Sequence, residues 1–317
     1  MFVQRIERSR RWPALRTRAL VVAGLLLCAT APSCASDKAA IAASVDATAT
    51  DSAVTDGAAD ASSNKHPSFA WPLDVSGPHN VGHRLTSVTY QGAGGIGSRT
   101  IPMHIWYPTA AETGDHPAPY GSMIVDTRSF EDAAVAAPDD GAKWPVMVYS
   151  HGHQGFAGSS VFLAWHFASH GWIVAAPDHV GNLLSDAILP RPTWVYYARA
   201  FDVSETLNYL EKLDAAAGFG AGVVDTQHTL LLGHSFGAHN CWSAAGATFD
   251  AATILADCAE EGGTIVKDDC SDVAMAVFAK GLAEPRVVAA APLAGTMHRG
   301  LNGPLGHEGA KIPVLSM

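Results

Sequence analysis

The stretch that most constrains the fold runs from Leu230 to His239. Three leucines lead directly into a Gly-x-Ser-x-Gly sequence made by Gly233, Ser235 and Gly237, and a segment able to form a helix follows. This order is typical of a sharp strand-to-helix bend that holds a serine hydroxyl above the end of a sheet. Side chains two residues to either side of the serine would collide in such a bend, which explains the two glycines.

The bend predicts a chemical role for two neighbouring residues. Ser235 is the candidate nucleophile, and the backbone N–H of Phe236, at the N-terminus of the following helix, is placed to stabilise an oxyanion formed there. The alternative is a chance Gly-x-Ser-x-Gly turn between a strand and a helix, which carries no chemistry.

The rest of the chain alternates strand-like and helix-like segments. An antiparallel hairpin is expected from Arg84 to Tyr107 around the glycine-rich turn Gly92 to Gly97, and 115–143 reads as irregular surface. Later segments have buried-strand or amphipathic-helix patterns. The expected strands are Pro145–Ser150, Trp172–Ala176, the nucleophile strand, Val287–Ala291 and Ile312–Leu315, and the expected helices are Ser159–His170, Phe201–Leu213 and Ala238–Ala247. Such alternation predicts an α/β fold with a mostly parallel sheet and helices on both faces.

Functional groups of such a sheet gather at the carboxyl ends of its strands. Ser235, the glycine-rich run His151 to Gly155 and the pair Asp178-His179 each follow an expected strand. We interpret His151 as a residue that ties its loop by hydrogen bonds, and Asp178 and Asp202 as structural.

Five stretches in this order resemble the α/β-hydrolase fold, and within it the group of dienelactone-hydrolase-like proteins, platelet-activating-factor acetylhydrolases and bacterial polyester hydrolases. The matching stretches are Ile105–Pro108, Ser150–Gly152, Ala168–Val174, Pro177–His179 and Gly233–Gly237. The resemblance implies that Ser235 attacks a carboxylic ester and that the backbone N–H groups of Phe236 and His153 form the oxyanion hole. It implies a small-molecule or lipid-like ester substrate and no cofactor or metal.

The resemblance also exposes a departure from the family. There, the catalytic acid follows the strand expected at Ile312–Leu315 and the histidine lies farther on, and no residue here matches either one. His298, His307 and Glu308 lie in the preceding loop and are not assigned to a triad. We therefore expect a truncated hydrolase that is nearly inactive as written, because an unassisted serine hydroxyl is a weak nucleophile. Its last strand would be left as an unpaired sheet edge.

The N-terminus predicts export. Six arginines precede an uncharged run from Ala19 to Pro32 and then small residues, the pattern of a signal peptide. We divide the chain into a signal peptide at 1–34, a flexible Ala/Ser/Asp/Thr-rich linker at 35–66, and an incomplete hydrolase domain at 67–317. Lipidation of Cys34 stays open, so the protein is expected to be periplasmic, secreted or a bacterial surface lipoprotein.

The charge of the chain limits the kinds of partner that we expect, and its cysteines indicate the compartment. Losing six arginines and one glutamate from 20 basic and 30 acidic residues leaves a net charge near −15 without a basic stripe. Nucleic acid is therefore excluded, and a membrane partner is expected only through a lipid on Cys34. A disulfide between Cys258 and Cys270 is expected in an oxidising compartment. Cys241 is interpreted as a small, buried thiol. The protein is expected to be a monomer.

Two readings from different functional classes remain. The first is an exported serine hydrolase acting on carboxylic esters, within which a thioester or lactone substrate would use the same machinery. The second is a non-catalytic binding protein built on the same fold, which the missing acid and histidine favour.

Overall fold

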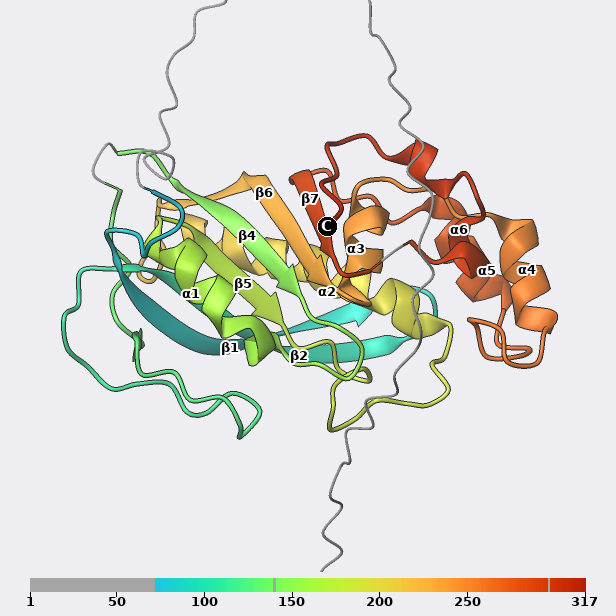
Figure 1. The fold of residues 1–317 in the computed structure, drawn as a ribbon, viewed down its shortest axis with the longest axis horizontal. Helices are drawn as coiled ribbons and strands as arrows, with labels where there is room; N and C mark the ends of the chain where they lie inside the picture. Colours follow the sequence, from blue (N-terminus) through green and yellow to red (C-terminus); the bar gives the residue numbers. More distant parts are fainter. Residues whose placement is uncertain (1–71, 139–140, 296) are drawn as a thin grey trace, which may run out of the picture. The chain divides into compact units, whose positions relative to one another are not determined.

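Seven strands form one mixed sheet in the part of the protein that the computed structural model describes, residues 72–138, 141–295 and 297–317 (Figure 1). The predicted signal peptide and linker, with Cys34, lie outside the described residues. The strands are β1 (Asn80–Gly92), β2 (Gly97–Thr109), β3 (Ser129–Glu131), β4 (Trp144–Ser150), β5 (Ile173–Pro177), β6 (Val224–His234) and β7 (Val287–Leu293).

The order across the sheet is β3-β1-β2-β5-β4-β6-β7. The predicted hairpin is confirmed: β1 and β2 are antiparallel and close at the pair Gly92 and Gly97. β2 lies antiparallel to β5, and β5, β4, β6 and β7 are parallel to one another. β3, a three-residue strand inside the segment predicted to be irregular, pairs parallel with β1.

Helices cover both faces of the sheet, as predicted. Alternate residues of β4 point to opposite faces. Val146 and Val148 pack in the core formed with α2 (Trp194–Ala215) and α3 (Gly237–Ala244). Met147 and Tyr149 pack on the other face with α1 (Val161–Ser169), which follows the short 3₁₀ turn Ala157–Ser160.

Three further helices were not predicted, and they lie together on the side toward which the arrows of β4 and β6 point (Figure 1). They are α4 (Ala251–Ala259), α5 (Asp272–Lys280) and α6 (Arg299–Asn302), and a single 3₁₀ turn, Gly306–Gly309, follows them. α4 and α5 each begin with a side-chain cap, Asp250 accepting from the Thr253 N–H and Ser271 from the Ala274 N–H. Within the described part of the chain, no helix has the length and apolarity needed to cross a bilayer.

The predicted strand at Ile312–Leu315 is wrong in extent. Only Val314 forms a bridge, parallel to Ala290 of β7, with hydrogen bonds on either side of it from Ala290 N–H to Pro313 O (3.0 Å) and from Leu315 N–H to Ala290 O (2.9 Å). Pro313 has no N–H to donate, which limits the ladder at this point.

Candidate active site

The bend after β6 has the geometry that its glycines predict. Ser235 has a positive φ of 52°, a conformation that non-glycine residues seldom adopt. A Cβ on Gly233 would lie 2.2 Å from the Gly237 carbonyl oxygen, and one on Gly237 would lie 2.0 Å from the Ser150 carbonyl oxygen. The Ser235 N–H donates to Leu293 O at the end of β7 (2.8 Å), so both neighbouring strands hold the bend.

The glycine-rich loop after β4 packs against this bend. A Cβ added to Gly152 would lie 3.3 Å from the Ser235 Cβ, so the loop backbone approaches the serine closely because Gly152 has no side chain. The structure thus brings together Ser235, Phe236 and the His151–Gly155 loop. Among the described residues, the backbone N–H groups of Phe236 and His153 donate no hydrogen bond. Ser235 itself is exposed.

His151 holds the loop, which confirms that expectation. Its ring is fully buried, Nδ1 lies 2.7 Å from Gly152 O, and Nε2 accepts from the His179 N–H at 3.0 Å. Burial, followed by the positive charge of Arg199, holds its pKa well below the usual value, so the ring is neutral. A neutral ring with Nδ1–H donating and Nε2 accepting satisfies both contacts.

A buried Ser–His–Asp arrangement lies under the loop. Ser150 Oγ is 3.0 Å from His179 Nε2, and His179 Nδ1 is 2.9 Å from Asp202 Oδ2. All three residues are fully buried, so no ester can reach the hydroxyl. Asp202 also accepts from both Arg99 and Tyr90, and these bonds confirm its structural role.

Asp178 is structural too, since its Oδ1 accepts the Ala157 N–H at 2.6 Å.

Arg199 and Asn182 support the same loop, and the sequence analysis missed both. Arg199 is 1% exposed and donates to His151 O, to Ser150 Oγ (3.1 Å) and to Asn182 Oδ1 (2.5 Å). Asn182 in turn contacts His153 Nδ1 through Nδ2 (2.7 Å) and accepts the Gln154 N–H (3.1 Å). Burial lowers the pKa of Arg199 to about 9. The available signal was an arginine on a helix face whose other buried residues are mostly apolar.

Aromatic rings and two guanidinium groups surround Phe236. Its ring centroid lies 5.2 Å from Tyr196, 5.9 Å from His239 and 5.5 Å from His298. The Cζ atoms of Arg191 and Arg199 lie 4.3 and 4.7 Å from it. The residue after the candidate nucleophile therefore sits in a positively charged aromatic environment.

No described histidine is hydrogen-bonded to Ser235. His298 packs in the aromatic cluster, where burial lowers its pKa to about 4, and His307 and Glu308 are exposed in the 3₁₀ turn. The described residues also contain no group of three His, Cys, Asp or Glu side chains arranged to hold a metal.

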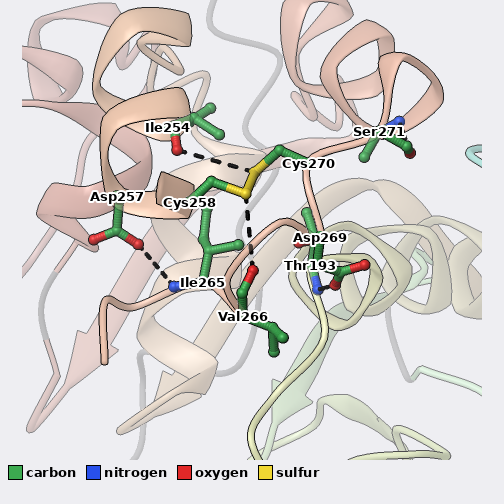
Figure 2. The surroundings of a disulfide bond; sticks show 10 residues. Thr193, Ile254, Asp257, Cys258, Ile265, Val266, Asp269, Cys270 and Ser271 are labelled. Carbon is green, nitrogen blue, oxygen red and sulfur yellow. Dashed lines mark hydrogen bonds between the residues drawn. A yellow bond between two sulfur atoms is a disulfide. The ribbon is translucent and has the colours of Figure 1, made fainter. Parts of the chain in front are cut away.

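The predicted disulfide is confirmed. Cys258 on α4 is bonded to Cys270, just before α5 (Figure 2). Next to it, Asp269 Oδ2 accepts the Thr193 N–H at 2.5 Å, and Asp257 Oδ2 accepts the Ile265 N–H at 2.7 Å. The disulfide segment therefore fixes the end of the loop that leads into α2. Cys241 is a free, buried thiol, as expected.

Comparison with known proteins adds a family match. Residues 118–187 match the model of platelet-activating factor acetylhydrolase, isoform II. This range contains the loop at His151–Gly155 and the pair Asp178-His179, but not Ser235. No curated protein matches the chain.

Among solved structures, a ferulic acid esterase from Streptomyces cinnamoneus is similar, with 20% identity and a TM-score of 0.48. The match covers 74% of this chain and spans 64% of the esterase chain. The sheet is that of an α/β-hydrolase-like fold, and residues 118–187 are similar to platelet-activating factor acetylhydrolase, isoform II.

Proposed function

We propose that this protein is an exported serine hydrolase that cleaves carboxylic esters, with Ser235 as the nucleophile and the N–H groups of Phe236 and His153 as the oxyanion hole. The observation that carries the proposal is the positive φ of Ser235 at a strand-to-helix bend against which Gly152 is packed. Backbone strain of this kind persists where surrounding structure enforces it, and it is concentrated at functional sites.

The chemistry follows from this arrangement. The Ser235 oxygen attacks the ester carbonyl carbon, its proton passes to solvent water because no described side chain is placed to accept it, and the carbonyl electron pair moves onto oxygen. The resulting oxyanion is stabilised by N–H donors that are already oriented, which is commonly the largest single contribution to acyl transfer. Collapse expels the alcohol, and water then hydrolyses the acyl-enzyme. Two N–H groups without a partner among the described residues support this assignment.

We infer slow turnover for the 317-residue chain. Ser235 has no hydrogen bond to a described histidine, so its hydroxyl stays protonated. Loss of the histidine from a serine protease triad costs about 10⁶ in turnover, while the oxyanion hole and substrate binding retain a residual activity. The same observation favours the second candidate function, a non-catalytic binding protein on this fold.

An experiment that needs no histidine separates the two candidates. A thiol ionises near neutral pH without a base, so Ser235→Cys gives the bend its own nucleophile. We expect 4-nitrophenyl acetate to acylate this variant at least tenfold faster than Ser122→Cys, measured by 4-nitrophenolate release and peptide mass. Ser122 is the matched control because it is also an exposed serine with positive φ, 59°. Equal acylation rates in the two cysteine variants would contradict the hydrolase function and leave the non-catalytic binding protein as the remaining candidate.

A second experiment tests the serine itself. The unmodified protein should form a covalent adduct with a fluorophosphonate on Ser235, slowly because no described base activates the hydroxyl, and Ser235→Ala should abolish both the adduct and any ester hydrolysis. Ser122→Ala should change neither. Rapid turnover by the unmodified chain that Ser235→Ala abolishes would confirm the nucleophile and refute the inference of slow turnover.

We also propose export through the N-terminal segment, with the charge pattern of its arginines as support. Expression in a bacterium should yield a processed protein outside the cytoplasm. The mass of its N-terminal peptide should show cleavage near residue 34. A diacylglyceryl group on Cys34 would establish a lipoprotein, and an unprocessed cytoplasmic chain would contradict export.

A further inference from the structure

Arg191 lies beside the candidate site and forms neither an ion pair nor a hydrogen bond within the described residues. It precedes α2 by three residues, and its Cζ atom lies 4.3 Å from the Phe236 ring centroid and 5.4 Å from that of Tyr196. Phe236 directly follows Ser235 in the chain. The guanidinium group is therefore placed next to the bend that presents the serine.

Three other arginines of the described domain are paired with carboxylates. Arg84 binds Asp132, Arg99 binds Asp202, and Arg286 binds Glu211 and Glu284. In the disulfide segment, Asp257 and Asp269 accept backbone N–H groups, and neither forms an ion pair with Arg191 (Figure 2).

The positive charge at Arg191 reaches the proposed oxyanion loop. Burial is the main reason that the pKa values of His153 and His298 are lowered, and the charge of Arg191 is the next contribution in both. Arg199, buried and hydrogen-bonded to neutral groups, adds a second positive charge on the same aromatic ring. This local excess contrasts with the net charge of −10 of the whole chain.

The geometry suits recognition of an anion. A guanidinium group stacked on an aromatic ring uses its face for the ring and keeps its N–H edge free for two oxygens of a carboxylate. Arg191 is only partly buried, so solvent and ligands reach it. Its backbone is held nearby, because Thr193 N–H donates to Asp269 and Tyr196 Oη donates to Thr264 O (2.9 Å).

We propose that Arg191 is a specificity-determining residue that selects esters carrying a second, negatively charged carboxylate group. The proposal rests on the ester hydrolase function above and names its substrate class. The free carboxylate of the substrate would lie on the edge of Arg191 while its ester carbonyl reaches Ser235.

The first test measures binding without turnover. Benzoate and benzamide differ in charge but hardly in shape, and calorimetry of the full chain should show benzoate binding about tenfold to a hundredfold more tightly. Arg191→Gln should remove this difference. Arg128→Gln is the matched control, since Arg128 also lies over an aromatic ring, 4.3 Å from the Trp165 centroid, but beside β3 at the far edge of the sheet. Equal affinity for the two ligands, or no detectable binding of either, would overturn the proposal.

The second test uses acylation. Mono(4-nitrophenyl) glutarate and its methyl ester present the same reactive carbonyl with and without a charge, and single-turnover release of 4-nitrophenolate gives their ratio of rates. We expect a preference of about tenfold or more for the acid, lost in Arg191→Gln and kept in Arg128→Gln. If Ser235→Ala abolishes acylation but the acid is not preferred over its methyl ester, the proposed role of Arg191 is overturned and the hydrolase function stands. A charge preference in benzoate binding without any acylation at Ser235 would instead overturn the hydrolase function.

Discussion

Gly237 stands where a methyl group has no room. A Cβ there would lie 2.0 Å from the Ser150 carbonyl oxygen, which is backbone and cannot move without shifting β4. The sequence predicted this crowding, because the two glycines of Gly-x-Ser-x-Gly are needed for steric reasons alone. It did not predict Arg199 or Asn182, since their contacts join residues far apart in the chain, such as Arg199 and Ser150.

We expect Gly237→Ala to lower the free energy of unfolding by at least about 3 kcal/mol, because overpacking against backbone displaces both the loop and the bend. Gly97→Ala separates this clash from ordinary backbone strain. Gly97 has φ +68° and open space around it, so its substitution should cost only about 1 kcal/mol. Urea unfolding of both variants makes the comparison, and equal losses would mean that the bend tolerates a side chain.

The buried Ser150–His179–Asp202 arrangement looks like a triad but should behave as a structural network. Ser150 Oγ donates to His179 Nε2 and accepts from Arg199 and Asn240, so Ser150→Ala leaves His179 Nε2 and the Asn240 amide without a partner and removes one hydrogen bond from Arg199. We expect a loss of about 1–3 kcal/mol in urea unfolding. Ser87→Ala, at an exposed position of β1, should cost almost nothing. Peptide mapping after treatment with an activated ester should find no acyl group on Ser150, and finding one would contradict its burial.

At the scale of elements, the buried strands and the hairpin followed from local pattern, because continuous apolar runs and a glycine-rich turn have few other solutions. α4 and α5 were missed since they lie on either side of a disulfide, in a segment where small and polar residues weaken the helical pattern. β3 was missed because three residues carry no periodicity. The segment between α4 and α5 is tied to a distant loop, since Asp269 accepts the Thr193 N–H.

The disulfide should therefore affect both the stability of the domain and its preference for a negatively charged ligand. It joins residues 12 apart, and closing a loop of this length stabilises a fold by about 3 kcal/mol in the chain-entropy model. We expect the Cys258→Ser/Cys270→Ser variant to lose stability and to lose amide-exchange protection between residues 251 and 280. Because Asp269 adjoins Cys270 and holds Thr193, the difference between benzoate and benzamide binding should shrink as well.

Cys241→Ala provides the control for this variant, because Cys241 is the free buried thiol of the described chain and lies on α3. It should leave both the exchange protection of 251–280 and the ligand preference unchanged. A double serine variant that keeps the full preference would show that Asp269 is held by α5 alone.

At the scale of the whole molecule, six histidines of the described domain, four of them buried and two half-buried, are held in a neutral state. Burial is the largest cause in every case, and it lowers each pKa from the usual value of 6.5. The pKa falls to about 4 for His83 and His298, to about 3 for His104 and His179, and well below the usual value for His151 and His239. The sequence shows where these histidines stand but not that they are buried, because burial is decided by packing across the sheet.

These shifts set the sign of the pH dependence. Between pH 6.5 and about 4 the unfolded chain binds protons at these histidines while the folded domain does not, so unfolding takes up protons and stability falls as the pH falls. Each such histidine contributes up to about 1.4 kcal/mol per pH unit, and six together approach the whole stability of a typical domain within about two units below 6.5. We expect the urea midpoint to be flat near pH 7.5 and to drop steeply from pH 6.5, well above the range in which carboxylates protonate.

The contribution of a single histidine to this pH dependence can be tested by substitution. His298 packs among Phe236, Tyr196 and His239, so an aromatic ring without a titratable group fits its place, and His298→Phe should reduce the slope of stability against pH between 6.5 and 4.5 by one histidine's share. His307→Gln is the comparison, because its side chain is exposed when folded and also when unfolded. Urea unfolding at several pH values measures both slopes. Identical slopes in the two variants would mean that His298 takes up its proton without unfolding the domain. The six-histidine account of acid instability would then fail at a residue that packs against Phe236.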